Sequence, residues 1–364
     1  MPELPEVERA ARLVRDVALH KRIVRVETTE DDIVYNGISH VEFAKELQDR
    51  VVTGVGRYGK VFYIELDGSG RMPVLHFGMT GMLQVRGEKA IYYRETPRKA
   101  STDWPPRFMK FILHVRNDES GATTELAFLD ARRLGRIRLC SSPLTEPPIS
   151  TLGFDPIISM PDLEVFTKSV RKRTCPIKAL LLDQSFSAGV GNWVADEILY
   201  HARIHPEARC HTLTDDQIAP LYRQTLEVCR IAVEVNADDS KFPEDWLFKY
   251  RWGKGKGKKY TMRLADGSPA TIKWITVGGR TSAYVAELQK LTQIVESEVL
   301  GSDGSESELT PITGSEDENK PVRKRKHRVE PTDSPTLSPV KRRSTRSNRV
   351  SVTLYEGTKD QGSN

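Results

Sequence analysis

Apolar residues near the start of the chain recur at the spacing of a helix. They occupy Val7, Ala11, Val14 and Ala18, so they share one face when residues 5–19 are wound as a helix. The sequence therefore predicts an amphipathic helix close to the N-terminus.

The pattern then changes to short runs of β-branched and aromatic residues, which continue from Ile23 to Leu139. Polar turns separate the runs, and NDESGA at 117–122 is typical of a hairpin turn. These runs predict antiparallel strands that form a sandwich or a barrel behind the leading helix. The polar and aromatic segment 86–107 predicts a long loop, and loops of this length are often functional.

Helical spacing returns after the proline-rich stretch SSPLTEPPIS, which ends at Ser150. The runs KKYTMRL and SPATIKWI later flank Asp266–Gly267, which is a strong signal for a β-hairpin. From about residue 295 Ser, Glu, Asp and Pro dominate, and such a segment buries too little apolar area to fold. The expected helices span 162–171, 176–186, 193–203 and 214–236.

These patterns predict a multidomain protein of the α+β class. We expect an N-terminal domain of antiparallel strands, a sandwich or a barrel, over 1–142, a linker over 143–150, a helical domain over 151–248, a β-hairpin domain over 249–294 and a disordered tail over 295–364.

The net charge of the 364 residues is only +5, but the basic residues are concentrated. Residues 168–178 hold five bases and no acid, and residues 249–280 hold nine against Asp266 alone. Two such clusters favour contact with a polyanion such as nucleic acid, although a basic run is also typical of a solvated face. In the tail, the clusters at 323–328 and 341–346 predict a bipartite nuclear signal; the alternative is an arm that binds nucleic acid.

The four cysteines are widely spaced and include no CxxC pair, so we expect neither a metal site nor a disulfide framework. We expect no cofactor and a reducing compartment. The sequence shows no signal peptide pattern and no apolar stretch long enough to cross a bilayer, which predicts a soluble intracellular protein without membrane contact.

The first residues, MPELPEVE, hold candidate chemistry. Removal of Met1 would expose Pro2 as a secondary amine, and a terminal amine is neutral at pH 7 far more often than a lysine. Its attack on an aldehyde-like carbon would give a charged iminium, which favours β-elimination. Glu3 could move the protons that this chemistry needs. The alternative is an ordinary helix start.

A second candidate site is the glycine-rich turn within KALLLDQSFSAGVGNWVADEILYHA. Gly189 and Gly191 permit close backbone approach, and Asn192 stands where a helix begins. Exposed N–H groups at a helix start form a seat for phosphate, and Arg173 and Lys178 precede the turn. The alternative is a plain helix–helix turn.

Four motifs, MPELPEVE, LHFGMTG (75–81), DARRLG (130–135) and SAGVGNWVADE (187–197), resemble the formamidopyrimidine-DNA glycosylase / endonuclease VIII family. The resemblance covers about residues 1–290. It implies an N-terminal β-sandwich, a helix–two-turns–helix domain and a terminal β-hairpin, with DNA bound between them. It also implies a bifunctional DNA glycosylase and abasic-site lyase of base excision repair, which works as a monomer on double-stranded DNA with an oxidised base or abasic site and nicks the strand by β,δ-elimination.

The resemblance also assigns roles to residues of this sequence. It makes Pro2 the Schiff-base nucleophile, Glu3 a proton donor and Lys60, in GRYGKVFYIEL, the proton donor during β-elimination. Arg280 matches an arginine that grips the phosphates of the lesion. The remaining implied DNA contacts are His76 to phosphate, Met79, Arg133 and Leu134 in the space left by the flipped nucleotide, and Arg173, Lys178 and Asn192 along the kinked backbone.

This sequence departs from the family pattern in three places. Ala131 and Leu134 stand where many members have proline and phenylalanine, which puts the choice of opposite base in doubt. The four cysteines of the bacterial zinc finger are missing, and YTMRL/ATIKWI followed by GGRTSAYV resembles the zincless finger of plant and fungal members. The insert 240–259 replaces a loop that caps oxidised guanine in bacterial members. The resemblance then favours formamidopyrimidines and hydantoins over 8-oxoguanine.

Two other functions remain open from the residues alone. A tautomerase with an N-terminal proline would explain Pro2 but neither the basic clusters nor the GVGN turn. A catalytically idle protein that binds DNA or RNA would explain the basic clusters but not the joint presence of Pro2, Glu3 and Lys60.

Overall fold

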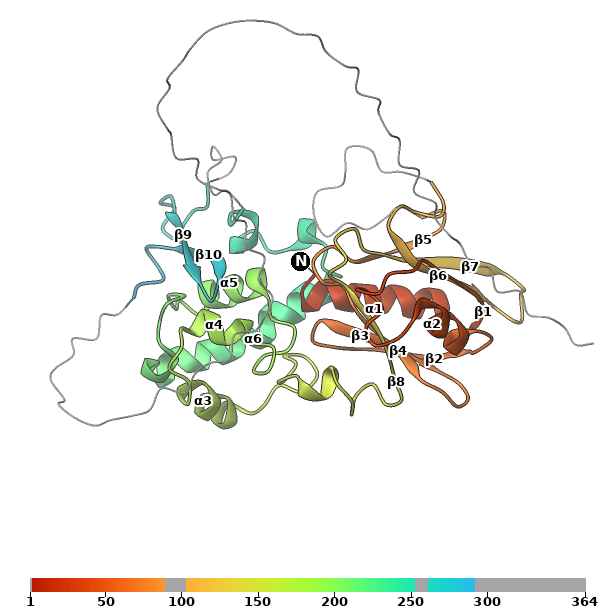
Figure 1. Ribbon diagram of the computed structural model, residues 1–364. Helices are drawn as coiled ribbons and strands as arrows, with labels where there is room; N and C mark the ends of the chain where they lie inside the picture. Colours follow the sequence, from red (N-terminus) through yellow and green to blue (C-terminus); the bar gives the residue numbers. More distant parts are fainter. Residues whose placement is uncertain (1, 89–102, 253–260, 292–364) are drawn as a thin grey trace, which may run out of the picture. The chain divides into compact units, whose positions relative to one another are not determined.

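The structure of the protein is a computed structural model that describes residues 2–88, 103–252 and 261–291 (Figure 1). The described residues belong to one unit of the chain. The predicted tail and its nuclear signal lie outside the described residues, as do parts of the predicted loop and of the insert.

The leading helix α1 runs from Leu4 to Ala18, as the apolar spacing predicts. Val7, Ala11 and Val14 are buried on its inner face. Pro5 stands in its first turn, where the missing N–H costs nothing. The helix packs on strands β2 and β3 (Val52–Tyr58 and Val61–Leu66), beside which Figure 1 shows it lying.

Two antiparallel sheets form the N-terminal half. One has the order β1-β6-β7-β5 and the other β2-β3-β4-β8. Both sheets contribute aromatic side chains to one core, in which Phe77 and Phe111 stack on Phe128 with ring centroids 5.5 and 5.4 Å apart. Helix α2 (His40–Leu47) packs on β1 and β4. The remaining strands are β1 (Arg22–Thr28), β4 (Met72–His76), β5 (Met82–Val85), β6 (Met109–Arg116), β7 (Thr123–Leu129) and β8 (Arg136–Cys140).

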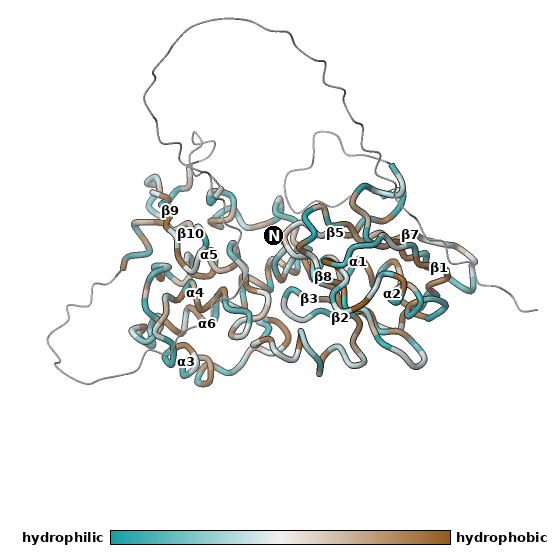
Figure 2. The backbone as a smooth tube through the Cα atoms, in the orientation of Figure 1, coloured by the Kyte–Doolittle hydropathy of each residue, from teal (hydrophilic) through white to brown (hydrophobic). Residues whose placement is uncertain are grey.

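Four α-helices follow, near the predicted positions: α3 (Leu163–Arg171), α4 (Ile177–Leu182), α5 (Asn192–His201) and α6 (Asp215–Glu234). Helix α4 ends at Leu182, four residues earlier than predicted. Asp183 Oδ1 accepts a hydrogen bond from the Ser185 backbone N–H, which folds the chain into a turn. Figure 2 shows α4 as a hydrophobic segment, and its leucines lie in a second core that also contains Leu4 of the leading helix. The start of the chain thus belongs to both halves. Short 3₁₀ turns occur at Ile149–Thr151, Cys210–Thr212, Asp239–Lys241 and Leu247–Lys249.

The terminal hairpin differs from the prediction. Strands β9 (Ile272–Val277) and β10 (Arg280–Val285) pair around Gly278–Gly279, so the predicted turn at Asp266–Gly267 is not the main one. Both glycines have positive φ, +58° and +68°, which the tight connection requires and which other residues rarely adopt. A smaller turn is present at Asp266–Gly267, where the Leu264 N–H donates to the Ser268 carbonyl at 2.8 Å and Arg263 forms an isolated bridge with Pro269. In the part of the chain that the structure describes, no helix is long and apolar enough to cross a membrane.

Candidate functional site

The N-terminus is inserted beside the turn that joins α4 to α5. Pro2 is buried, and the Leu4 N–H donates to the Gly189 carbonyl at 3.0 Å. Glu3 is also buried; its carboxylate accepts the backbone N–H groups of Trp193 at 3.0 Å and Val194 at 3.1 Å. Glu3 therefore caps the first turn of α5. Of the predicted phosphate seat, the Trp193 and Val194 N–H groups are therefore occupied by a carboxylate of the protein, and a phosphate contact at the rest of this helix start stays a prediction.

The close approach of Glu3 explains the glycines of the turn. A Cβ at position 191 would lie 2.3 Å from the Glu3 carboxyl carbon, and one at position 189 would lie 2.8 Å from Leu4 Cβ. Gly189 also has φ +97°. Any side chain at either position would displace the first residues of the chain.

Lys60 enters the same region from the turn between β2 and β3. Its Nζ donates to the Val190 carbonyl at 3.0 Å, and the Gly59 N–H before it donates to Asp155 Oδ2 at 2.8 Å. Burial lowers the pKa of Lys60, and the positive charge of Arg280 lowers it further, whereas Glu3 raises it. The charges of Glu3 and Arg280 thus act on Lys60 in opposite directions.

Glu6, a further residue of the MPELPEVE motif, is a buried carboxyl. Its Oε2 accepts the Glu3 N–H at 2.9 Å, and its Oε1 accepts the Trp193 indole N–H at 3.2 Å. Burial first, and then the charge of Glu3, raises the pKa of Glu6 to about 7. This carboxyl holds and releases a proton near neutral pH, one hydrogen bond from Glu3. The MPELPE motif contains it, but burial cannot be read from the motif.

His76 ends β4 opposite Val61, next to Lys60. Burial lowers its pKa to about 4, with a further contribution from the positive charge of Lys60. Its Nδ1 accepts the Gly78 N–H at 3.1 Å, so the proton of the neutral ring is on Nε2. His76 therefore offers an uncharged N–H donor at pH 7.

Met79 and Leu134, both half-buried, belong to two loops that touch. A Cβ on Gly78 would lie 2.3 Å from the Leu134 carbonyl oxygen. Arg133, in the same loop as Leu134, has φ +58° and directs its guanidinium to Asp31, with contacts of 3.0 to 3.1 Å. The insertion of Arg133 into DNA remains a prediction. For Arg133 to reach DNA, its ion pair with the buried carboxylate of Asp31 must first break.

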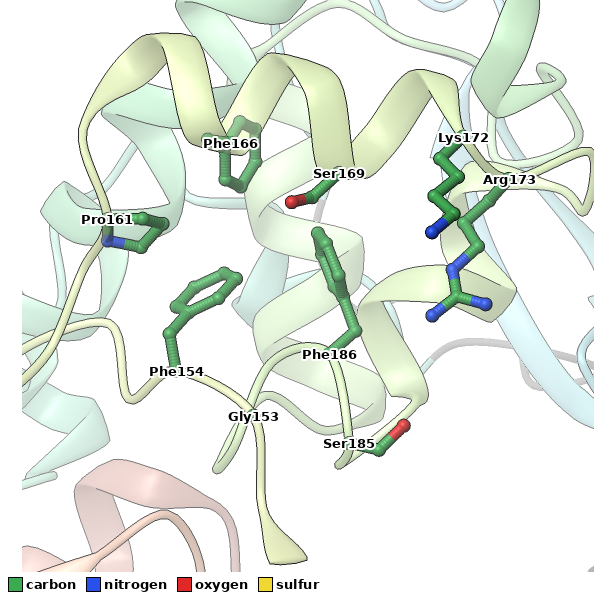
Figure 3. A pocket seen from close by; sticks show the side chains of 9 residues that line it. All are labelled: Gly153, Phe154, Pro161, Phe166, Ser169, Lys172, Arg173, Ser185 and Phe186. Atoms are coloured by element: carbon green, nitrogen blue, oxygen red, sulfur yellow. The ribbon is translucent and has the colours of Figure 1, made fainter.

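Arg173 is exposed on the rim of a cavity of about 300 Å³ beside α3. Figure 3 shows Phe154, Phe166 and Phe186 grouped in this cavity, with Arg173 and its neighbour Lys172 at one side. Pro2, Glu3, Lys60 and Arg280 are not among its lining residues. This cavity is therefore separate from the N-terminal site.

Lys178 and Asn192 point into the protein. The Lys178 ammonium is fully buried, donates to the Asn192 carbonyl at 2.7 Å and is ion-paired with Asp196. The Asn192 amide donates to the Thr281 carbonyl at 2.9 Å. Direct phosphate contacts by these two residues remain predictions, because in this structure both support the hairpin instead.

Asp196 is the centre of that support, and sequence interpretation gave it no role. Besides Lys178, its carboxylate binds the Arg251 guanidinium at 2.6 Å and the Ala283 N–H of β10 at 3.2 Å. The buried Asp196 carboxylate of α5 therefore contacts three other segments that are distant in the sequence. Within the described ranges, no group of three or more His, Cys, Asp or Glu side chains could hold a metal ion.

Comparison with known proteins identifies the family of this chain. Its N-terminal domain model, "Formamidopyrimidine-DNA glycosylase N-terminal domain", matches residues 1–137, and its H2TH domain model matches residues 152–244. A formamidopyrimidine-DNA glycosylase of Arabidopsis thaliana is 40% identical over 291 residues, which cover 80% of this chain and 71% of the relative. The chain belongs to the formamidopyrimidine-DNA glycosylase family.

Bacterial members of the formamidopyrimidine-DNA glycosylase family are also similar to this chain in sequence and in structure. The protein of Pelotomaculum thermopropionicum is 32% identical, over 80% of this chain and 100% of its own length. A solved complex of a Lactococcus lactis family member with DNA that contains Fapy-dG has a TM-score of 0.63 at 25% identity, and covers 80% of this chain and all of that one. The family resemblance and the α+β fold class predicted from the sequence are confirmed.

Proposed function

We propose that this member of the formamidopyrimidine-DNA glycosylase family is a bifunctional enzyme of base excision repair. It removes oxidised purines from double-stranded DNA and cuts the strand at the abasic site that results. The observation that supports the proposal is that Glu3, which follows Pro2 in the chain, and Lys60 both contact the segment that leads into α5, at Trp193 and at Val190, and that the charges of Glu3 and Arg280 both act on Lys60. Relatives with the family name and a relative bound to Fapy-dG DNA support the substrate class.

The chemistry follows from the proton-bearing groups. After loss of Met1, the Pro2 amine attacks C1′ of the damaged nucleotide, the base departs, and an iminium forms. Loss of a C2′ proton then expels the 3′ phosphate, and a second elimination expels the 5′ phosphate. Lys60, whose pKa is lowered by burial, gives up its proton more readily than an exposed lysine. Glu3 exchanges protons at the sugar while α5 holds it in place.

Borohydride trapping on a duplex with an abasic site tests the nucleophile. We expect covalent trapping of the mature protein, weaker trapping of Pro2→Gly through its primary amine, and none when residues precede Pro2. The matched control is the same extended protein after its extra residues have been cleaved off. Equal trapping of the extended protein would show that another amine reacts, and absence of trapping in every form would favour a binding protein without activity.

Arg280 should act on bent DNA rather than as a general positive charge. It follows Gly278–Gly279 at the hairpin tip and is exposed, and its guanidinium can hold phosphate bidentately. We expect Arg280→Ala to weaken binding to abasic-site duplexes much more than to undamaged DNA. The control is Arg263→Ala, an exposed arginine on the preceding turn, which should weaken both duplexes equally. Equal weakening by Arg280→Ala would contradict its assignment.

The lesion preference and the cellular site belong to the same proposal. We propose formamidopyrimidines and hydantoins as the preferred lesions, a zincless finger, a monomeric enzyme and delivery to the nucleus by the basic tail clusters at 323–328 and 341–346. Cleavage of a panel of duplexes with single lesions tests the preference. A chelator should leave activity intact, and removal of residues after 295 should abolish nuclear delivery but not cleavage. Loss of cleavage with the tail would show that the enzyme needs it.

A further inference from the structure

Two cysteines that are far apart in the sequence face each other in the helical domain. Pro176 and Arg209 form an antiparallel bridge, and next to it the Cys210 N–H donates to the Cys175 carbonyl at 3.1 Å. This pairing places Cys175 directly opposite Cys210. Opposed residues of this kind have Cα atoms about 5.5 Å apart, within the roughly 4.4–6.8 Å that a disulfide spans.

The two thiols differ in reactivity. Cys175 is half-buried, whereas Cys210 is fully buried, and both are free. A hydrogen bond between the thiols lowers the pKa of Cys175 to about 7, and the positive charge of Arg173 contributes in the same direction. The same hydrogen bond, together with burial, raises the pKa of Cys210. Cys175 thus has both the more accessible thiol and the lower pKa of the pair.

The other two cysteines lack this arrangement. Burial raises the pKa of Cys140 and of Cys229. The Cys140 thiol donates to the Pro147 carbonyl at 3.5 Å, and Cys229 lies within the core of the helical domain. Neither has the thiolate character that reaction with peroxide requires.

We propose that Cys175 and Cys210 form a redox-sensitive dithiol that hydrogen peroxide closes into a disulfide. The Cys175 thiolate attacks one peroxide oxygen, the O–O bond breaks, and Cys175 becomes a sulfenic acid while the departing hydroxide takes a proton to give water. Cys210 sulfur then attacks Cys175 sulfur; the S–O bond breaks, and the hydroxide that leaves takes the Cys210 proton as a second water. Two thiols are oxidised and one peroxide is reduced to two waters.

The bridge would change the segment that carries Arg173. The Arg209 guanidinium already donates to the Thr174 carbonyl at 3.2 Å, so the two strands are in contact on both sides of Cys175. A disulfide brings the sulfur atoms to about 2.05 Å and so restrains the residues next to them. This consequence rests on the proposed function, in which Arg173 contacts the DNA backbone, and it predicts weaker DNA binding by the oxidised enzyme.

Thiol counting on the full chain tests the dithiol without DNA. After brief treatment with hydrogen peroxide, we expect the reactive thiols of the denatured protein to fall from four to two. A non-reducing digest should contain one peptide pair that joins residues 175 and 210, two hydrogens lighter than the free peptides. Cys210→Ser should stop at a sulfenic acid on Cys175 that dimedone traps, and Cys175→Ser should retain its three thiols. Cys140→Ser and Cys229→Ser are matched controls that should still form the bridge.

Four thiols after treatment, or a bridge through Cys140 or Cys229, would overturn the proposal. The coupling to DNA is measured separately, as affinity for a duplex with a stable abasic-site analogue. We expect the affinity of oxidised wild type to fall at least threefold and to return on addition of dithiothreitol, with no change in Cys175→Ser. A bridge that forms without any change in affinity would overturn the coupling, whereas failure of the reduced enzyme to bind DNA would instead refute the proposed function.

Discussion

The β-sandwich and the terminal hairpin are held by different forces. Phe77, Phe111 and Phe128 stack in a core shared by two sheets. The hairpin has only a small apolar cluster, and β10 depends on the buried carboxylate of Asp196. A hydrophobic core tolerates small shifts, whereas a charge network places one strand at a defined position. The comparison predicts that damage to the core reduces stability, while damage to the network reduces activity.

The largest effect should follow removal of the Asp196 carboxylate. Asp196→Ala leaves the charges of Lys178 and Arg251 buried without their carboxylate, which costs about 3–5 kcal/mol. It also frees β10 and so moves Arg280, and a displacement of about 1 Å can lower the rate by about 10²-fold. Single-turnover cleavage of an abasic duplex and urea unfolding measure the two effects. Asp118→Ala, which removes an exposed ion pair with Arg22, is the control and should change neither.

Damage to the core should reduce stability by a similar amount but leave activity unchanged. We expect Phe128→Ala to lower the free energy of unfolding by about 3–5 kcal/mol, because it leaves a cavity between the sheets. Cleavage per folded molecule should stay near wild type, since this ring packs on Phe77 and Phe111 in the core between the sheets. If the folded fraction of Phe128→Ala lost activity as Asp196→Ala does, the two regions would not differ as described.

Glu6 should make the free energy of unfolding depend on pH. Its pKa is raised from 4.5 to about 7 in the folded protein, so folding favours the protonated carboxyl and stability falls as the pH rises between these values. A difference of this size corresponds to roughly 3 kcal/mol. We expect Glu6→Gln to remove this loss, which urea unfolding at a series of pH values would measure. A parallel decline in both proteins would contradict the assignment.

The smallest effect on stability and cleavage should follow removal of a neutral hydrogen bond to Arg251, a partner of Asp196. The Trp274 indole N–H donates to the Arg251 carbonyl at 2.9 Å. Its removal in Trp274→Phe should cost about 1 kcal/mol and leave cleavage unchanged. A large loss of cleavage would mean that the Trp274 hydrogen bond, rather than the carboxylate of Asp196, positions β10.

The sequence predicted most helices and strands and the family, but it did not predict the contacts between buried polar side chains. The spacing of Val7, Ala11 and Val14 predicted α1, because a buried helix face leaves a period in the sequence. The hairpin was placed at Asp266–Gly267 although Gly278–Gly279 makes the turn, because both pairs are good turn residues and only strand pairing distinguishes them.

Buried polar contacts were less predictable still. Asp196 lies in the middle of a helix, where a carboxylate is usually solvated, and its partners are 18, 55 and 87 residues away. Cys175 and Cys210 are 35 residues apart in the sequence, yet the antiparallel bridge between Pro176 and Arg209 places them face to face. Long-range partners of this kind leave no local pattern to detect.

The cap that Glu3 places on α5 also sets an order of assembly during synthesis. Pro2 and Glu3 are among the first residues to leave the ribosome, but the N–H groups that fix Glu3 belong to Trp193 and Val194. A nascent chain that has completed only the β-sandwich cannot hold its own N-terminus in this position. The N-terminus therefore stays accessible to the removal of Met1 that the proposed function requires until the helical domain has emerged, and only then is Pro2 drawn into its buried position.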